Sequence, residues 1–134
     1  MAERGFTLIE LIVVIAILGI LAAIIIPNVT GRTYDAQVSK VKADIQTVGT
    51  QVLVFKVHTG RLPETLEELV SASGVEGWRG PYLDEAPRDP WGNPYKYLKP
   101  GFGGRAFEVY SLGADGSEGG DGENADVFRR EEDK

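Results

Sequence analysis

An uninterrupted apolar segment near the start of the chain is its most constraining feature. The residues from Leu8 to Ile26 carry no charge except the carboxylate of Glu10. As an α-helix, these roughly 19 residues would rise about 1.5 Å each and cover the ~30 Å hydrocarbon core of a bilayer. The sequence therefore predicts one membrane-spanning helix at residues 6–27. The rest of the 134-residue chain has room for a single modest domain.

Glu10 is an unusual residue for such a segment. An ionised carboxylate inside lipid costs on the order of a few kcal/mol or more, so it needs a partner or a role. One interpretation is that Glu10 lies near the helix end and reaches water among the lipid head groups. The other is that it serves a function. The polar leader MAERG, residues 1–5, precedes the apolar run. An ordinary secretory signal is instead cleaved after its hydrophobic part.

The segment GFTLIELIVVIAILGILAAIIIPN, residues 5–28, resembles the signal and N-terminal helix of type IV pilins and type II secretion pseudopilins. The resemblance implies that a prepilin peptidase cleaves between Gly5 and Phe6 and that the new amino group of Phe6 is methylated. It also implies that Glu10 is required for assembly. We expect the Glu10 carboxylate to pair with the amine of a neighbouring subunit, so that two charges costly in lipid neutralise each other and fix the register.

The composition of the chain argues against some other functions and some other ways of stabilising the fold. The formal net charge is −6, which argues against a nucleic-acid-binding surface. The chain has no cysteine, so no disulfide can hold a long loop in place, even in an oxidising compartment. Most of the 17 glycines and 7 prolines follow residue 59, which predicts a loop-rich C-terminal half.

A second helical pattern follows the apolar segment. Apolar residues recur at alternating spacings of three and four, which predicts one apolar stripe on an amphipathic helix. The stripe runs for under three heptads, which favours packing on the domain's own sheet over a free coiled coil. Pro27 is expected to kink the helix or loosen one turn. The stripe consists of Val38, Val41, Ile45, Val48, Val52 and Phe55.

Local signals divide the next part of the chain. Gly60 is expected to end the helix, and Thr65 with Glu68 matches a capping box, which predicts a short second helix to about Ala72. The proline-rich segment 77–94 is expected to be an ordered loop whose large side chains seal the edge of the core. Those side chains are Trp78, Tyr82, Leu83 and Trp91.

Two short runs rich in aromatic and β-branched residues lie further on, at residues 95–98 and 107–112. The loop KPGFGGRA separates them, so we expect a β-hairpin. The predicted fold class is therefore α+β, with a long N-terminal helix packed on a small antiparallel β-sheet with ordered loops.

The C-terminal motifs narrow the resemblance. DPWGNPYKY at 89–97 and YSLGADG at 110–116 resemble the major pseudopilins of type II secretion systems, and the likeness extends over residues 5–127. It implies a pilin-like fold with four parts. These are a leader peptide (1–5), a transmembrane helix (6–27), a periplasmic head that includes the amphipathic half of the helix (28–128), and a charged tail (129–134).

The segment from Ser111 to Val127 gathers acidic and amide side chains among glycines. Hard oxygen ligands on a permissive backbone suit Ca²⁺, although the spacing is not that of an EF-hand. A solvated acidic loop is the alternative. The resemblance implies a calcium site that would pin the loop in the absence of a disulfide. By position, the ligands are the side chains of Asp115, Asn124 and Asp126 and the carbonyl of Leu112, with Ser117 and Asp121 as additional contacts. Asn124 stands where relatives often have Asp, which lowers the charge of the site.

Catalytic motifs are absent from the sequence. The sole histidine, His58, follows the amphipathic helix and belongs to no recognisable motif, so we interpret it as a surface or junction residue. The chain has neither a nucleophile elbow nor an HExxH motif. The run GFGGR at 101–105 lacks a following helix and is read as a hairpin loop, not a phosphate cradle. The sequence therefore predicts that the protein is not an enzyme.

The resemblance implies a structural role. The chain would be a single-pass protein of the bacterial inner membrane with its head in the periplasm, and would polymerise with itself into a pseudopilus. The pseudopilus would help drive folded proteins through the outer-membrane secretin. The further implied partners are minor pseudopilins, the prepilin peptidase and the inner-membrane assembly platform. Two alternatives remain: the major subunit of a type IV pilus, and a membrane-anchored calcium-binding module that does not polymerise. Type IV pilins more usually close their C-terminal region with a disulfide, which this chain cannot form.

Overall fold

The computed structural model describes residues 5–72 and 74–129, with the side chains of residues 24–32 left out of the description. The chain divides into two compact units, Met1–Ala36 and Gln37–Lys134. A single helix, α1 (Leu8–Thr59), runs through both units. It continues across Pro27, so the proline does not end the helix. All of the predicted leader except Gly5, and all of the predicted charged tail except Arg129, lie outside the described residues.

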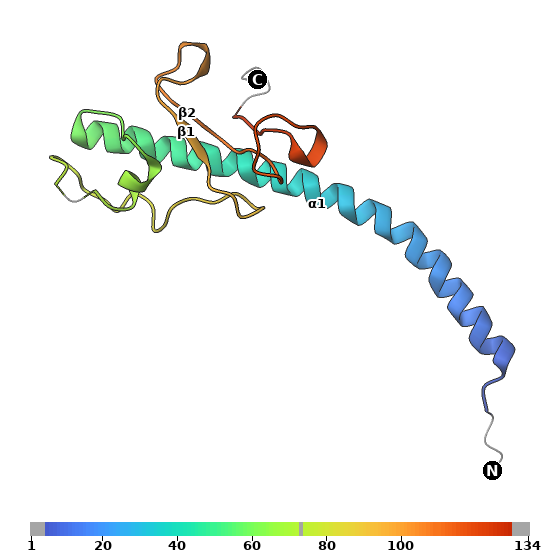
Figure 1. Ribbon diagram of the computed structural model, residues 1–134. Coiled ribbons are helices and arrows are strands. Elements are labelled where there is room, and N and C mark those ends of the chain that lie inside the picture. Colours follow the sequence, from blue (N-terminus) through green and yellow to red (C-terminus); the bar gives the residue numbers. More distant parts are fainter. Residues whose placement is uncertain (1–4, 73, 130–134) are drawn as a thin grey trace. The chain divides into compact units, whose positions relative to one another are not determined.

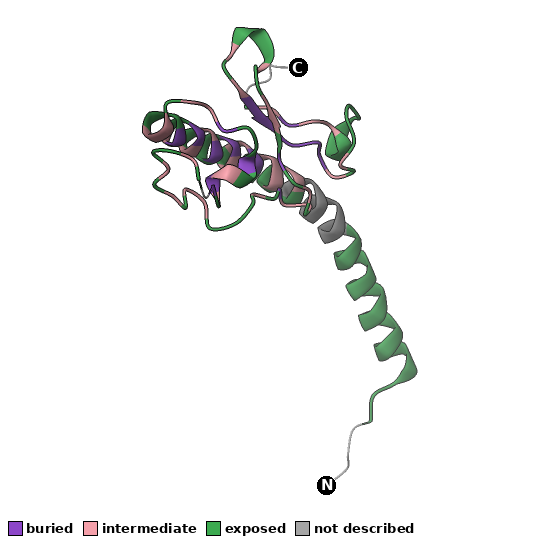
Figure 2. Ribbon diagram, turned by 60° about the vertical axis from the view of Figure 1, so that its left-hand side comes forward, coloured by how far each residue is buried: buried purple, intermediate pink, exposed green. Residues whose placement is uncertain are grey.

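The N-terminal unit consists of the first part of α1 and the residues before it. Thr7 caps the helix, because its Oγ1 accepts a hydrogen bond from the backbone N–H of Glu10 at 3.3 Å. The large apolar side chains from Leu8 to Leu21 are exposed, from 46% at Val14 to 78% at Leu8 (Figure 2). Within the residues described in full, no helix has both the length and the hydropathy needed to cross a membrane. The span at residues 6–27 stays a prediction.

The second part of α1 forms one side of the head, the unit from Gln37 onward. Five of the six predicted stripe residues are buried, and Val38 packs partly buried against them. In Figure 2 the buried positions line one face of this part of the helix. The stripe therefore packs within its own domain, as predicted. The helix ends at Thr59 because Gly60 adopts a φ of 78° and donates its N–H to the Lys56 carbonyl at 2.8 Å.

The predicted second helix is wrong in both length and cap. The structure has a short 3-10 helix, η1 (Leu66–Leu69), and Thr65 makes no side-chain capping bond. The carboxylate of Glu68 binds Arg61 and the N–H of Glu64 instead. The Leu69 carbonyl accepts the N–H groups of Tyr82 and Leu83 at 2.7 and 3.1 Å, so it is engaged by the following loop. Tertiary contacts have replaced the bonds that would extend the helix.

The predicted hairpin is confirmed. Strand β1 (Lys96–Leu98) pairs antiparallel with β2 (Glu108–Tyr110), with Tyr97 opposite Val109. Between them lies the short helix η2 (Phe102–Gly104). Both strands lie beside the second half of α1 (Figure 1). The core between helix and sheet contains Phe55, Leu69, Tyr95 and Val109. One long helix and one small antiparallel sheet confirm the α+β class.

The loop at 77–94 seals this core, as predicted. Its four large side chains are partly buried and pack against the core cluster. The Trp78 indole N–H donates to the Glu68 carbonyl at 2.9 Å, and the Trp78 ring meets the Tyr82 ring edge-on. The loop is therefore held by specific hydrogen bonds as well as by apolar contact.

Candidate functional site

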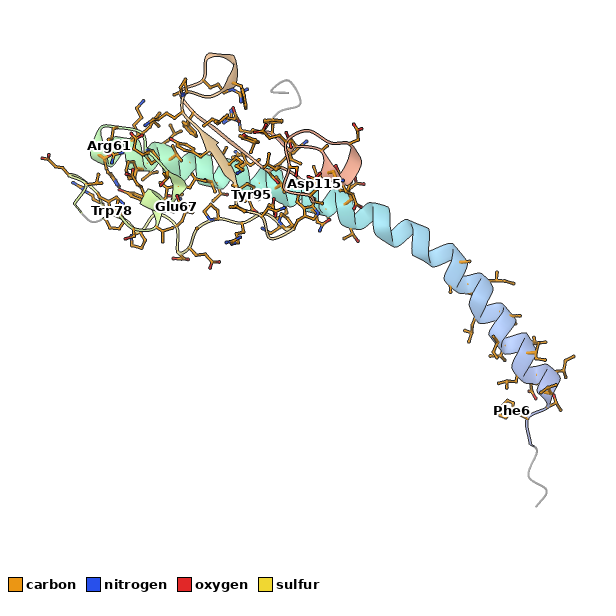
Figure 3. All side chains as sticks on the ribbon, viewed as in Figure 1. Phe6, Arg61, Glu67, Trp78, Tyr95 and Asp115 are labelled. Carbon is orange, nitrogen blue, oxygen red and sulfur yellow. The ribbon has the colours of Figure 1, made fainter. Side chains whose placement is uncertain are left out.

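The segment 112–126, here called the acidic loop, leaves and re-enters the head at one point. Ser111 and Val127 exchange two backbone hydrogen bonds of 3.0 and 2.8 Å, which close the base of the loop. One step further out, the Ala114 N–H donates to the Glu123 carbonyl at 2.9 Å. A short helix, η3 (Gly122–Asn124), lies on the returning arm. Figure 3 labels Asp115 on this loop.

The two arms of the acidic loop approach each other closely at Gly113. This residue has a φ of 72°, and an added Cβ would lie 2.7 Å from the Ala125 carbonyl oxygen. Only glycine fits a position that combines a left-handed backbone with such a short approach. The path of the loop next to Leu112 is therefore fixed by backbone contacts between the arms.

Two of the predicted ligand side chains, those of Asp115 and Asp126, are held by N–H groups of the loop itself. Asp115 Oδ1 accepts from the Ser117 N–H at 3.0 Å. Asp126 Oδ2 accepts from the Gly119 N–H at 3.0 Å. On the returning arm, the Asn124 N–H donates to the carbonyl of Asp121 at 3.1 Å. These bonds order the oxygen-rich side of the loop.

Two oxygens of the predicted set lack a hydrogen-bond donor in the described part of the chain. One is Asp126 Oδ1, which is fully shielded from solvent. The other is the carbonyl oxygen of Leu112, a residue that is 6% exposed. A buried oxygen without a donor is costly, and a cation would relieve that cost for both oxygens. The donor chemistry therefore fits Ca²⁺, which takes carboxylate, amide and carbonyl oxygens.

Among the described residues, no three His, Cys, Asp or Glu side chains come together in a group that could hold a metal ion. The four main predicted calcium ligands do not require such a group. They are two carboxylates, from Asp115 and Asp126, together with one amide and one main-chain carbonyl.

The acidic loop also acts electrostatically on its surroundings. Burial raises the pKa of the Tyr110 phenol, and the nearby carboxylates of Glu118 and Asp126 raise that pKa further. The negative charge of these two carboxylates therefore acts on Tyr110, the last residue of β2.

The structure adds residues that the sequence reasoning missed. Asp89 is only 5% exposed, and its carboxylate accepts three hydrogen bonds. Oδ1 accepts the N–H groups of Trp91 and Asn93, and Oδ2 accepts the hydroxyl of Ser111 at 2.7 Å. The turn from Asp89 to Asn93 has a local sequence signal, because Asp side chains commonly bind backbone N–H groups that follow closely in the chain. The hydrogen bond from Ser111 to Asp89 has no such signal, because it joins residues 22 positions apart.

His58 is a junction residue, as interpreted from the sequence. It is half-buried, and its Nδ1 lies 2.8 Å from the Tyr82 hydroxyl. The same hydroxyl accepts the Arg79 N–H at 3.0 Å. His58 thus connects the end of α1 to the loop at 77–94.

The residues predicted for processing and assembly lie together at the start of the chain. Phe6, labelled in Figure 3, is 84% exposed. Glu10, in the first turn of α1, is also exposed. A long helix that begins with an exposed apolar half, and a head built from its second half with a small sheet, define a pilin-like subunit. A family model described as type II secretion system, protein G, matches residues 28–130. The prokaryotic N-terminal methylation motif matches residues 1–26. The chain belongs to the type II secretion system protein G family.

Individual relatives agree with this assignment. The type II secretion system core protein G of Pseudomonas aeruginosa is 44% identical over 133 residues, covering 93% of each chain. Its counterpart from Vibrio cholerae is 41% identical, covering 93% of this chain and 90% of the relative. The crystal structure of the major pseudopilin from enterohaemorrhagic Escherichia coli superposes with a TM-score of 0.61 at 28% identity. That match covers 75% of this chain and 92% of the pseudopilin.

Proposed function

We propose that this chain is the structural major subunit that polymerises into the periplasmic pseudopilus of a type II secretion system and helps drive folded proteins through the outer-membrane secretin. The family match over residues 28–130 carries this proposal. The exposed apolar side chains between Leu8 and Leu21 support it, because a single chain in water would not leave so continuous an apolar surface uncovered.

Before assembly, the subunit is a single-pass protein of the inner membrane with its head in the periplasm. The apolar run from Leu8 to Ile26 supports this arrangement by its length and composition. A prepilin peptidase cleaves between Gly5 and Phe6, and the Phe6 amine is methylated. The match of residues 1–26 to the N-terminal methylation motif supports the processing step.

Two features of Glu10 support a role between subunits. The Thr7 cap fixes the first helical turn, and Glu10 lies exposed within that turn. The positive end of the helix dipole favours a carboxylate at this position. In lipid, the Glu10 carboxylate and the Phe6 amine of a neighbouring subunit neutralise each other only when both are in register. We infer that this pair selects correctly placed subunits.

The subunit's partners are then copies of itself, minor pseudopilins, the prepilin peptidase, the inner-membrane assembly platform and the secretin. We assign the chain no catalytic role, because its relatives are core components of a secretion system.

A calcium ion in the acidic loop would stabilise the head. Asp115 and Asp126 would supply carboxylates, Asn124 an amide oxygen and Leu112 a carbonyl, with Ser117 as an additional contact. The two oxygens without donors in the described part of the chain, on Asp126 and Leu112, support this set. The bound ion supplies positive charge that cross-links the two arms of the loop.

The assembly proposal is tested by filament formation and secretion in cells that depend on this chain. Glu10→Gln removes the charge while keeping the side-chain size, and Glu10→Ala removes both. We expect either variant to insert into the membrane normally but to form few or short filaments by electron microscopy and to lose secretion. Glu118→Gln, which removes an exposed charge from the head, is the matched control and keeps both activities. Normal filaments from both Glu10 variants would contradict the proposal.

A further inference from the structure

The turn at residues 89–93 contacts the acidic loop at its base through buried polar groups. Asp89 is 5% exposed and Ser111 is fully buried. A carboxylate and a hydroxyl in such positions are costly unless both are fully hydrogen-bonded. These two are bonded to each other at 2.7 Å, and each also binds backbone N–H groups.

The order of donors and acceptors in this arrangement is fixed. The Ser111 hydroxyl donates to Asp89 Oδ2, because a carboxylate oxygen is an acceptor. The lone pairs of Ser111 Oγ are then free to accept, and Oγ accepts the Gly113 N–H at 3.1 Å. The carboxylate therefore determines that Ser111 presents an acceptor to Gly113.

The Gly113 N–H belongs to the same peptide unit as the Leu112 carbonyl. This peptide is trans and planar, so its N–H and C=O point in opposite directions. Holding the N–H against Ser111 Oγ directs the Leu112 oxygen to the other side. That oxygen receives no hydrogen bond from the described part of the chain and is one of the predicted calcium ligands.

We propose that Asp89 and Ser111 are positioning residues for the calcium loop, acting through the Gly113 N–H to aim the Leu112 carbonyl at the ion. The inference rests on the calcium site proposed above and extends it to residues outside the loop. Groups that orient metal ligands from behind commonly change metal affinity by 10–100-fold when removed.

Asn93 provides an internal comparison. Its Nδ2 donates to the Gly113 carbonyl at 3.0 Å. That carbonyl belongs to the next peptide unit, so Asn93 steadies the loop without setting the direction of the Leu112 oxygen. Its removal should weaken binding less than the removal of the Ser111 hydroxyl.

The test uses the full chain in detergent micelles with Tb³⁺ as a luminescent substitute for Ca²⁺. Titration gives the affinity, and emission lifetimes in H₂O and D₂O give the number of water molecules on the ion. We expect Ser111→Ala to lower affinity about tenfold and to add about one water, because water replaces the misdirected carbonyl. Asp89→Asn should act in the same direction, since an amide N–H facing Ser111 reverses the hydroxyl. Asn93→Ala should leave the water count unchanged.

Tyr97→Phe is the control for general destabilisation. It removes the hydrogen bond from the Tyr97 hydroxyl to the Pro63 carbonyl, away from the loop, and should lower the melting temperature without changing the water count. Should Ser111→Ala fail to fold, Asp89→Asn decides by the same two readouts. Wild-type affinity and water count in the variant that folds would overturn the positioning role alone. If the wild-type chain shows no saturable Tb³⁺ binding that Ca²⁺ displaces, both the proposed calcium site and the positioning role are wrong. The proposal on assembly is still tested separately, by the filament experiment on Glu10.

Discussion

Replacing Asp126 by alanine should change the stability of the head in opposite directions with and without calcium. When a chelator has removed calcium, Asp126→Ala loses one exposed hydrogen bond, from the Gly119 N–H to Oδ2, which is worth about 1 kcal/mol. It also removes the buried Oδ1, whose lack of a donor costs about 1–3 kcal/mol. Without calcium, the free energy of unfolding of Asp126→Ala should therefore equal that of the wild type or exceed it by up to about 2 kcal/mol.

Calcium reverses this order. At a free concentration of about 100 times its dissociation constant, a ligand that binds only the folded state adds about 2.7 kcal/mol to the free energy of unfolding. For a domain of this size, that corresponds to a rise in melting temperature of roughly 10–20 °C. The wild-type chain should show this rise. Asp126→Ala should not, because it has lost a carboxylate ligand.

The assay is thermal unfolding of the full chain in detergent, followed by tryptophan fluorescence in calcium and in chelator. Glu118→Ala is the matched control, because it removes a negative charge from the same loop but lies outside the predicted ligand set. It should keep the calcium-dependent rise. Equal stabilisation of wild type and Asp126→Ala by calcium would refute the reasoning. So would a loss of several kcal/mol by Asp126→Ala in chelator, because Oδ1 would then be making a favourable interaction.

Two further predictions concern the head outside the loop. Phe55 is fully buried and meets the Tyr82 ring edge-on, so Phe55→Ala should lower the free energy of unfolding by about 3–5 kcal/mol in denaturant titrations. Val57→Ala, on the same helix but 81% exposed, should change it by less than about 0.5 kcal/mol, and similar losses for both would contradict the packing described. Glu68 has a pKa below its ordinary 4.5, chiefly because Arg61 forms hydrogen bonds to its carboxylate. A lowered folded-state pKa stabilises the head above the unfolded pKa, and this contribution disappears as pH falls through the folded value. The stability gap between wild type and Glu68→Gln should therefore close in acid, and a gap that stays constant as the pH falls would contradict this reasoning.

The parts of the fold that were predictable from sequence depend on local periodicity. The apolar stripe from Val38 to Phe55 repeats at the helical period, and Gly60 ends the helix by a conformation that glycine adopts readily. The hairpin around β1 and β2 likewise joins segments close in sequence. Such features need no knowledge of distant contacts.

The capping-box prediction failed because its residues are used by tertiary contacts. Thr65 and Glu68 have the right spacing, but Arg61 binds both oxygens of the Glu68 carboxylate, at 3.0 and 3.2 Å. A bidentate ion pair competes well against a single bond to a backbone N–H. The same pattern, Thr7 with Glu10, does mark a helix start, where the Thr7 cap is formed. The sequence alone does not distinguish these two cases.

The acidic loop shows why its supporting residues were not predictable. Its chemistry is evident from composition, but the group that orients Leu112 begins at Asp89, and only the folded register brings Asp89 to Ser111. The base of the loop is fixed by that pair, by the Ser111–Val127 bonds and by the stacked rings of Tyr110 and Phe128, 5.1 Å apart.

Further out, the loop is held mainly by single hydrogen bonds such as those to Asp115 and Asp126. Each is worth about 1 kcal/mol, against the mutual repulsion of several carboxylates. A chain without cysteine cannot add a covalent link there. The fold thus supplies a firmly held base, and the calcium ion proposed above would stabilise the outer part of the loop.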